Sequence, residues 1–83
     1  MKVSEDRATI FFKSTPKFYE LEESGLKCNT VREFNYSDKM LFEDAEPYLE
    51  SICITNSKTG EKFFKYLTNI SEWNGIYIFS WHP

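Results

Sequence analysis

The chain is poor in the residues from which many catalytic and cofactor sites are built. Its 83 residues include one histidine, two cysteines and three glycines. His82 is the residue before the last, where a side chain is more often disordered than catalytic, so no serine–histidine–aspartate triad is expected. Cys28 and Cys53 are too few for a disulfide framework or a four-thiolate zinc site. The widely spaced glycines exclude a phosphate-binding loop. We therefore expect no metal site and no cofactor.

The sequence also lacks a long apolar run and a dominant charge. No segment reaches the ~20 apolar residues of a membrane span, and acids occupy the start of the chain where a signal peptide would be apolar. We therefore expect a soluble, cytoplasmic protein with no membrane partner. Ten basic and thirteen acidic residues give a net charge of −3, which argues against sequence-blind coating of DNA but leaves room for a local basic pocket.

Aromatic residues are plentiful, with eight phenylalanines, five tyrosines and two tryptophans. Each can bury ~150–250 Å², which is enough to give a chain of this length one compact core. We therefore predict a single domain over residues 1–83, with residues 1–7 polar and frayed.

Turn residues and the spacing of apolar residues divide the chain into short elements. Pro16 suits a first helical position and Gly25 a helix stop, and Phe18 and Leu21 would face the core. Residues 35–50 fit either a capped helical turn or a poorly formed strand with an acidic loop. The other predicted elements are strand 8–13, helix 14–25, strand 27–34, a hairpin of 48–56 and 61–70, loop 71–74 and strand 75–81. This order predicts an α+β fold, a small, bent mixed or antiparallel sheet with one short helix between its first two strands.

The segment GLKCNTVREF, residues 25–34, holds the strongest candidates for a binding site. In an extended strand Thr30 and Arg32 share one face, about 6.5–7 Å apart, and Lys27 lies at the corner before it. A hydroxyl, a guanidinium and an ammonium together suit an anionic or carbonyl-rich ligand. The alternative is an ordinary ion pair of Arg32 with Glu33 or Glu20, and the pattern alone favours that alternative because such pairs outnumber functional sites.

Residues 25–32 read G-x-K-x-x-T-x-R, which resembles the motif of ASCH domains in the PUA-like superfamily and of related small phage and bacterial domains. The element order extends this resemblance over most of residues 8–81. The resemblance implies a small β-barrel with a cleft beside the motif, and a function in recognising RNA or a nucleoside. Lys27, Thr30 and Arg32 match the motif positions.

Some ASCH proteins hydrolyse acylated cytidine with a lysine, a threonine and a glutamate. The resemblance implies Lys27 and Thr30 for the first two roles, and Glu72 in the predicted loop before the last strand is the candidate for the third. The Gly-Asp pair that often follows the motif is missing, which weakens the catalytic interpretation. Trp73 in the same loop either stacks on a base or covers the core.

Three functions are therefore compatible with the sequence. The favoured hypothesis is a domain that binds RNA or a modified nucleoside through Lys27, Thr30, Arg32 and Trp73. The second is an amidohydrolase for acylated cytidine with Lys27, Thr30 and Glu72 as catalytic residues. The third is a phage-type inhibitor or regulator, in which the acidic segment 43–50 faces a basic protein partner.

Overall fold

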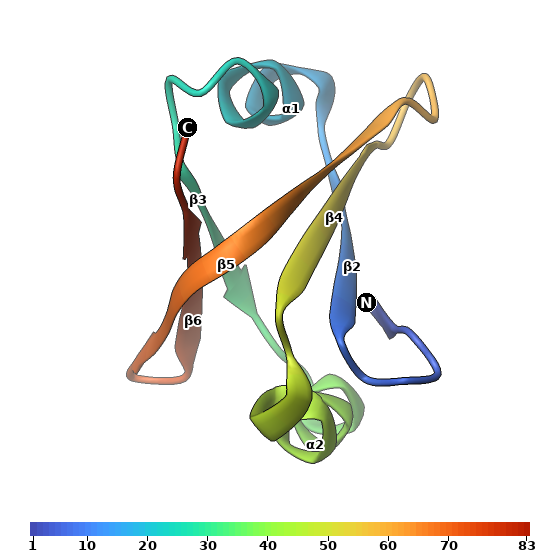
Figure 1. Ribbon diagram of the computed structural model, residues 1–83, viewed down its shortest axis with the longest axis vertical. Helices are drawn as coiled ribbons and strands as arrows, with labels where there is room; N and C mark the ends of the chain where they lie inside the picture. Colours follow the sequence, from blue (N-terminus) through green and yellow to red (C-terminus); the bar gives the residue numbers. More distant parts are fainter.

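The computed structural model describes residues 1–83 as a six-stranded sheet with a helix at each end (Figure 1). This arrangement belongs to the α+β class, as predicted. Neither helix is long and apolar enough to cross a membrane. The elements are β1 (Lys2–Val3), β2 (Thr9–Ser14), α1 (Pro16–Glu23), β3 (Asn29–Glu33), α2 (Tyr36–Ala45), a 3-10 turn η1 (Glu46–Tyr48), β4 (Ser51–Asn56), β5 (Lys62–Trp73) and β6 (Ile76–Trp81).

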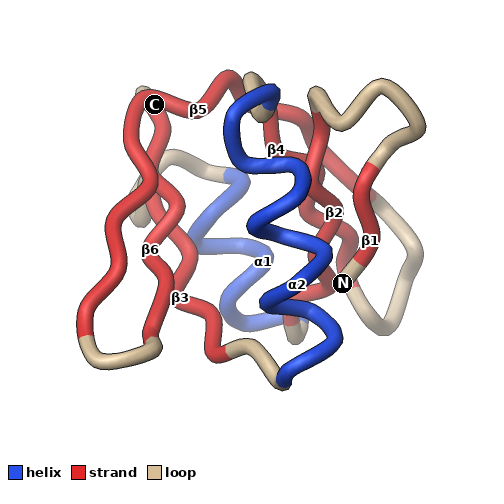
Figure 2. The backbone as a smooth tube through the Cα atoms, turned by 90° about the horizontal axis from the view of Figure 1, so that it is seen from below, coloured by secondary structure: helices blue, strands red, loops and turns tan.

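The strands lie in the order β1-β2-β4-β5-β6-β3. Strands β2 and β4 are parallel, and every other neighbouring pair is antiparallel. The sheet curls so that β3 and β2 lie on facing sides, and α1 and α2 lie across its two ends (Figure 1 and Figure 2). Its backbone ladder stays open with β1 and β3 as the two edges, and hydrogen bonds between strands do not close the barrel that the resemblance implies.

The second helix, α2, corrects our prediction of one helix, and it forms from the segment that the sequence left open. Asn35 caps it, because its Oδ1 accepts a hydrogen bond from the Asp38 N–H at 2.8 Å. Phe42 and Ala45 are its buried residues and anchor it to the core. In α1 the buried residues are Tyr19 and Glu22 in place of the predicted Phe18 and Leu21.

The strands also extend further than the sequence indicated. Residues 71–73 continue β5 where we predicted a loop, and the chain reverses at Asn74 and Gly75 with φ values of 55° and 81°. Positive φ at both central residues is the geometry of a type I′ hairpin, for which Asn-Gly is the preferred pair. At the other end of the chain, two of the residues expected to be frayed, Lys2 and Val3, form β1, which pairs with β2.

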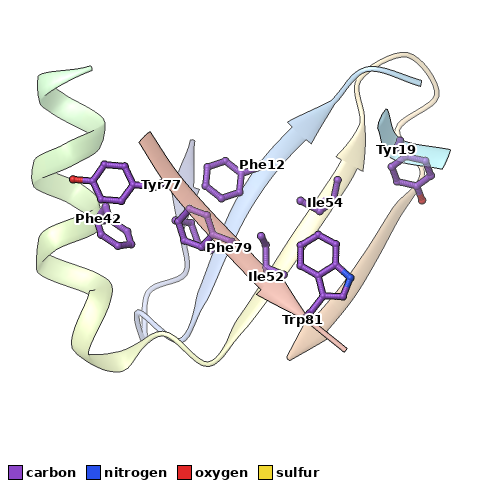
Figure 3. Packing of buried hydrophobic residues seen from close by; sticks show 9 residues of the cluster. Phe12, Tyr19, Phe42, Ile52, Ile54, Tyr77, Phe79 and Trp81 are labelled. Carbon is purple, nitrogen blue, oxygen red and sulfur yellow. The ribbon is translucent and has the colours of Figure 1, made fainter. Parts of the chain in front are cut away.

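The core lies between the concave side of the sheet and the two helices. Phe42 of α2 packs against Tyr77 of β6 at one end of the core, and Tyr19 of α1 lies at the other end (Figure 3). Phe34, just after β3, stacks on Phe12 of β2 with ring centroids 6.1 Å apart. Side-chain packing therefore holds the β2 and β3 sides together where no backbone ladder joins them.

Candidate functional site

The site is built at the open side of the sheet, where β2 faces β3. Strand β1 pairs only with residues 10 and 11 of β2, so residues 12–14 have no strand on that side. The Arg32 guanidinium bridges the gap from β3. Its Nη1 donates to the Lys13 carbonyl oxygen and its Nη2 to the Ser14 hydroxyl, both at 2.8 Å. The same group lies over the Phe12 ring, with its carbon Cζ 4.6 Å from the ring centroid. We call these three contacts of Arg32 with Phe12, Lys13 and Ser14 the Arg32 bridge.

A buried carboxylate on α1 continues the network. Glu22 is 1% exposed, and its Oε1 accepts from the Ser14 hydroxyl at 2.7 Å. Its Oε2 lies 3.5 Å from the Lys27 ammonium, which also donates to the Asn29 carbonyl oxygen at 2.7 Å. A buried charge is tolerated when it is paired and hydrogen-bonded, and Glu22 has both kinds of partner.

Thr30 completes the chain of polar contacts. Its Oγ1 accepts from Arg32 Nε at 3.0 Å, and the residue is 2% exposed. Burial lowers the pKa of Arg32, and the nearby Glu22 carboxylate partly opposes that shift. Since arginine stays protonated in proteins, the guanidinium remains a fixed donor. One polar network therefore joins Lys27, Glu22, Ser14, Arg32 and Thr30.

A cleft of about 330 Å³ opens beside this network between α1 and the edge of β3. Lys13, Lys27, Arg32 and Glu22 are its charged lining residues, so its formal charge is +2 in a protein of net charge −3. Phe18 also lines it, with half of the residue exposed and its ring centroid 5.9 Å from Lys27 Nζ. The cleft thus offers positive charge and an aromatic surface side by side.

Several hydrogen-bonding groups in the cleft keep unused capacity. The Lys27 ammonium has three N–H groups and two partners, and Arg32 uses three of its five N–H groups. The backbone N–H of Trp81 donates to the Cys28 carbonyl oxygen. By the alternation of an antiparallel ladder, Val31 therefore turns its backbone N–H and C=O away from β6. Val31 also lines the cleft. A ligand there meets both donors and an acceptor.

The structure brings together three of the five predicted site residues. Lys27, Thr30 and Arg32 line one cleft, whereas Glu72 and Trp73 do not line it. Glu72 is an exposed residue of β5 opposite Tyr77, and Trp73 is 71% exposed at the end of the same strand.

Arg32 pairs with neither Glu33 nor Glu20, the partners of the alternative interpretation, because its hydrogen bonds go to β2 and Thr30.

Sequence reasoning missed Glu22, although a signal for it was present. Glu22 follows Tyr19 by three residues and Phe18 by four, which puts it on the same helical face as both. A carboxylate on the apolar stripe of a short helix indicates a buried partner, and Lys27 five residues later supplies it.

No model of a known protein family, no curated protein and no solved structure matches the chain. No group of three or more histidine, cysteine, aspartate or glutamate side chains is arranged to hold a metal ion.

The Arg32 bridge predicts a cost for the substitution Arg32→Lys. A lysine cannot reproduce the planar fork that contacts Lys13, Ser14 and Thr30 together, so we expect the free energy of unfolding in urea to fall by about 1–3 kcal/mol. The matched control is Arg7→Lys, at an exposed arginine 3.6 Å from Asp44, where we expect a loss of about 1 kcal/mol or less. Equal losses at the two positions would contradict the bridge.

Proposed function

We propose that the cleft between α1 and β3 binds a nucleoside or nucleotide unit, as in a PUA-like domain that recognises RNA. The observation that carries this proposal is the position of the Lys27 ammonium at the cleft wall, 3.5 Å from a Glu22 carboxylate oxygen and 5.9 Å from the centroid of the exposed Phe18 ring. A volume of about 330 Å³ falls within the ~300–1,000 Å³ typical of small-molecule sites.

The phosphate and the base of a nucleotide each have matching groups in the cleft. The lysines at its wall, Lys13 and Lys27, attract a phosphate or another anionic group. Phe18 provides a flat surface on which a base can stack. The backbone N–H and C=O of Val31 suit the donor and acceptor groups along a base edge. Phe18 thereby takes the stacking role that is one of the two alternatives for Trp73 in the sequence.

The resemblance of residues 25–32 to the ASCH motif supports the same proposal. In a PUA-like barrel the motif lies beside a ligand cleft, and here its lysine, threonine and arginine line one. We infer that the fold is a PUA-like barrel in which the Arg32 bridge, and not a backbone ladder, spans β2 and β3.

An NMR titration with uridine and cytidine 5′-monophosphates tests this function. We expect the amide signals of residues 13–18 and 25–34 to shift, because these segments line the cleft. The substitution Lys27→Gln should weaken binding at least tenfold, since it removes a charge-assisted contact worth about 1.5–3 kcal/mol. Lys17→Gln is the control, because Lys17 is an exposed residue of α1 that does not line this cleft.

Shifts confined to other residues, or equal binding by the Lys27 and Lys17 variants, would overturn the proposal.

The Glu22 carboxylate beside Lys27 favours a second candidate, the hydrolysis of acylated cytidine. Glu22 takes the role for which Glu72 was the candidate from the sequence. In this reaction Glu22 accepts a proton from water as the water oxygen adds to the acyl carbon, and Lys27 donates to the developing oxyanion. The C–N bond then breaks, the amine nitrogen receives the proton, and the products are a carboxylic acid and cytidine.

Turnover of N4-acetylcytidine by the purified protein decides whether the cleft is catalytic. If it is, Glu22→Gln should lower kcat by about 100-fold or more, since it removes the general base. Circular dichroism of the same variant separates a loss of chemistry from a loss of folding. No release of cytidine by the wild-type protein would exclude this candidate and leave the binding function standing.

A further inference from the structure

The convex face of the sheet carries a second candidate binding surface. The strand register shows which residues lie on it. Residues that lie opposite each other in neighbouring strands point to the same side. Three rows across β2, β4 and β5 therefore face outward, away from the buried Ile10, Ile52 and Ile54. We call them the outer rows: Thr9, Ser51 and Tyr66; Phe11, Cys53 and Phe64; and Lys13, Thr55 and Lys62.

Aromatic side chains on the outer rows stand uncovered. Phe64 is 56% exposed and Tyr66 is 79% exposed, and Phe11 beside them is half-buried. Cys53, between Phe11 and Phe64, is fully buried beneath them. Both helices pack at the ends of the sheet and leave this face open (Figure 1).

The charge on this face is positive, in contrast to the protein as a whole. Lys13 and Lys62 belong to the outer rows, and Lys2 of β1 lies opposite Phe11 with its Nζ 5.9 Å from the ring centroid. None of the nine positions in the outer rows is acidic, although the protein has thirteen acidic residues. The nearest acids along the chain, Glu50 and Glu61, lie just outside the paired positions. Charge of one sign is therefore concentrated on the face that exposes the aromatic rings.

A groove connects the outer rows with the cleft. It has a volume of about 540 Å³, and Lys2, Phe11, Lys13 and Arg32 are among its lining residues. Lys13 and Arg32 also line the cleft. A chain-like ligand can therefore run from the cleft past the Arg32 bridge and onto the outer face without leaving a positively charged surface.

We propose that the outer rows bind single-stranded nucleic acid that continues from the nucleotide in the cleft. Bases stack on Phe64, Tyr66 and Phe11, and Lys2, Lys13 and Lys62 contact phosphates, which is the combination used by proteins that bind single strands without reading sequence. Strands β2 and β5 lie two strand spacings apart, about 10 Å, so one short oligonucleotide can reach the aromatic rings on both strands. This inference rests on the proposed function for the nucleotide in the cleft, and it names the ligand as an oligonucleotide.

Fluorescence anisotropy with a labelled uridine octanucleotide tests the outer rows directly. Because one stacked base contributes roughly tenfold in affinity, the double substitution Phe64→Ala with Tyr66→Ala should weaken octanucleotide binding at least tenfold. Binding of uridine 5′-monophosphate by the same variant should stay unchanged. Tyr36→Ala is the matched control, because Tyr36 on α2 is also 79% exposed, and it should bind the octanucleotide as the wild type does.

The salt dependence of octanucleotide binding tests the phosphate contacts with a variant that leaves the aromatic surface intact. Each phosphate contact on a single strand contributes about 0.7 to the slope of log affinity against log salt concentration. Lys62→Gln should therefore reduce the slope by about 0.7, whereas Lys39→Gln, at an exposed lysine on α2, should leave it unchanged.

The two ligands separate this inference from the proposed function. If the monophosphate binds in the cleft but the wild type binds the octanucleotide no more tightly, the outer rows are not a nucleic-acid surface. Equal affinity of the Phe64/Tyr66 and Tyr36 variants for the octanucleotide would overturn the inference too. If the octanucleotide binds through Phe64 and Tyr66 while the monophosphate does not bind, the cleft function fails and the outer rows remain as the nucleic-acid surface.

Discussion

The guanidinium of Arg32 is the contact on which the rest of the site depends. It spans the side of the sheet that has no backbone ladder, where it contacts a carbonyl oxygen and a hydroxyl of β2 and lies over the Phe12 ring. The other direct contact between these two sides is aromatic, the stacking of Phe34 on Phe12. A planar group with five fixed donors suits this task, because it can satisfy several acceptors on two elements at once.

The same contacts give the cleft its chemistry. Ser14 receives one hydrogen bond from Arg32 and gives another to the buried Glu22, so the bridge and the carboxylate are parts of one network. Glu22 in turn pairs with Lys27 and holds its ammonium at the cleft wall. A partly satisfied buried network would be costly, and each buried group here has a partner. Groups that hold the fold together are therefore also the groups that a ligand meets.

Turn residues and apolar spacing predicted those parts of the fold that are determined by residues close together in the sequence. Pro16 and Gly25 mark the limits of α1 to within two residues, and alternating apolar residues identify the β4–β5 hairpin. The parallel pairing of β2 with β4 arises from packing between segments distant in the chain, which no local pattern encodes. Residues 35–45 have weak apolar periodicity, so the cap at Asn35 and the burial of Phe42 decide their helix.

In the site, the motif at residues 25–32 predicted the three residues that line one cleft, Lys27, Thr30 and Arg32. Glu22 could not be predicted in the same way, because its role depends on which face of α1 is buried.

A double-mutant cycle on Arg32 and Ser14 tests most directly whether the bridge is one cooperative unit. The free energy of unfolding in urea is measured for Arg32→Met, Ser14→Ala and the double variant, with each protein compared with the wild type. Side chains in one hydrogen-bond network couple by about 0.5–3 kcal/mol. The account predicts a coupling of about 1 kcal/mol or more, so that the double variant is less destabilised than the two single losses added together. Additive losses would mean that Arg32 and Ser14 act independently, and would contradict it.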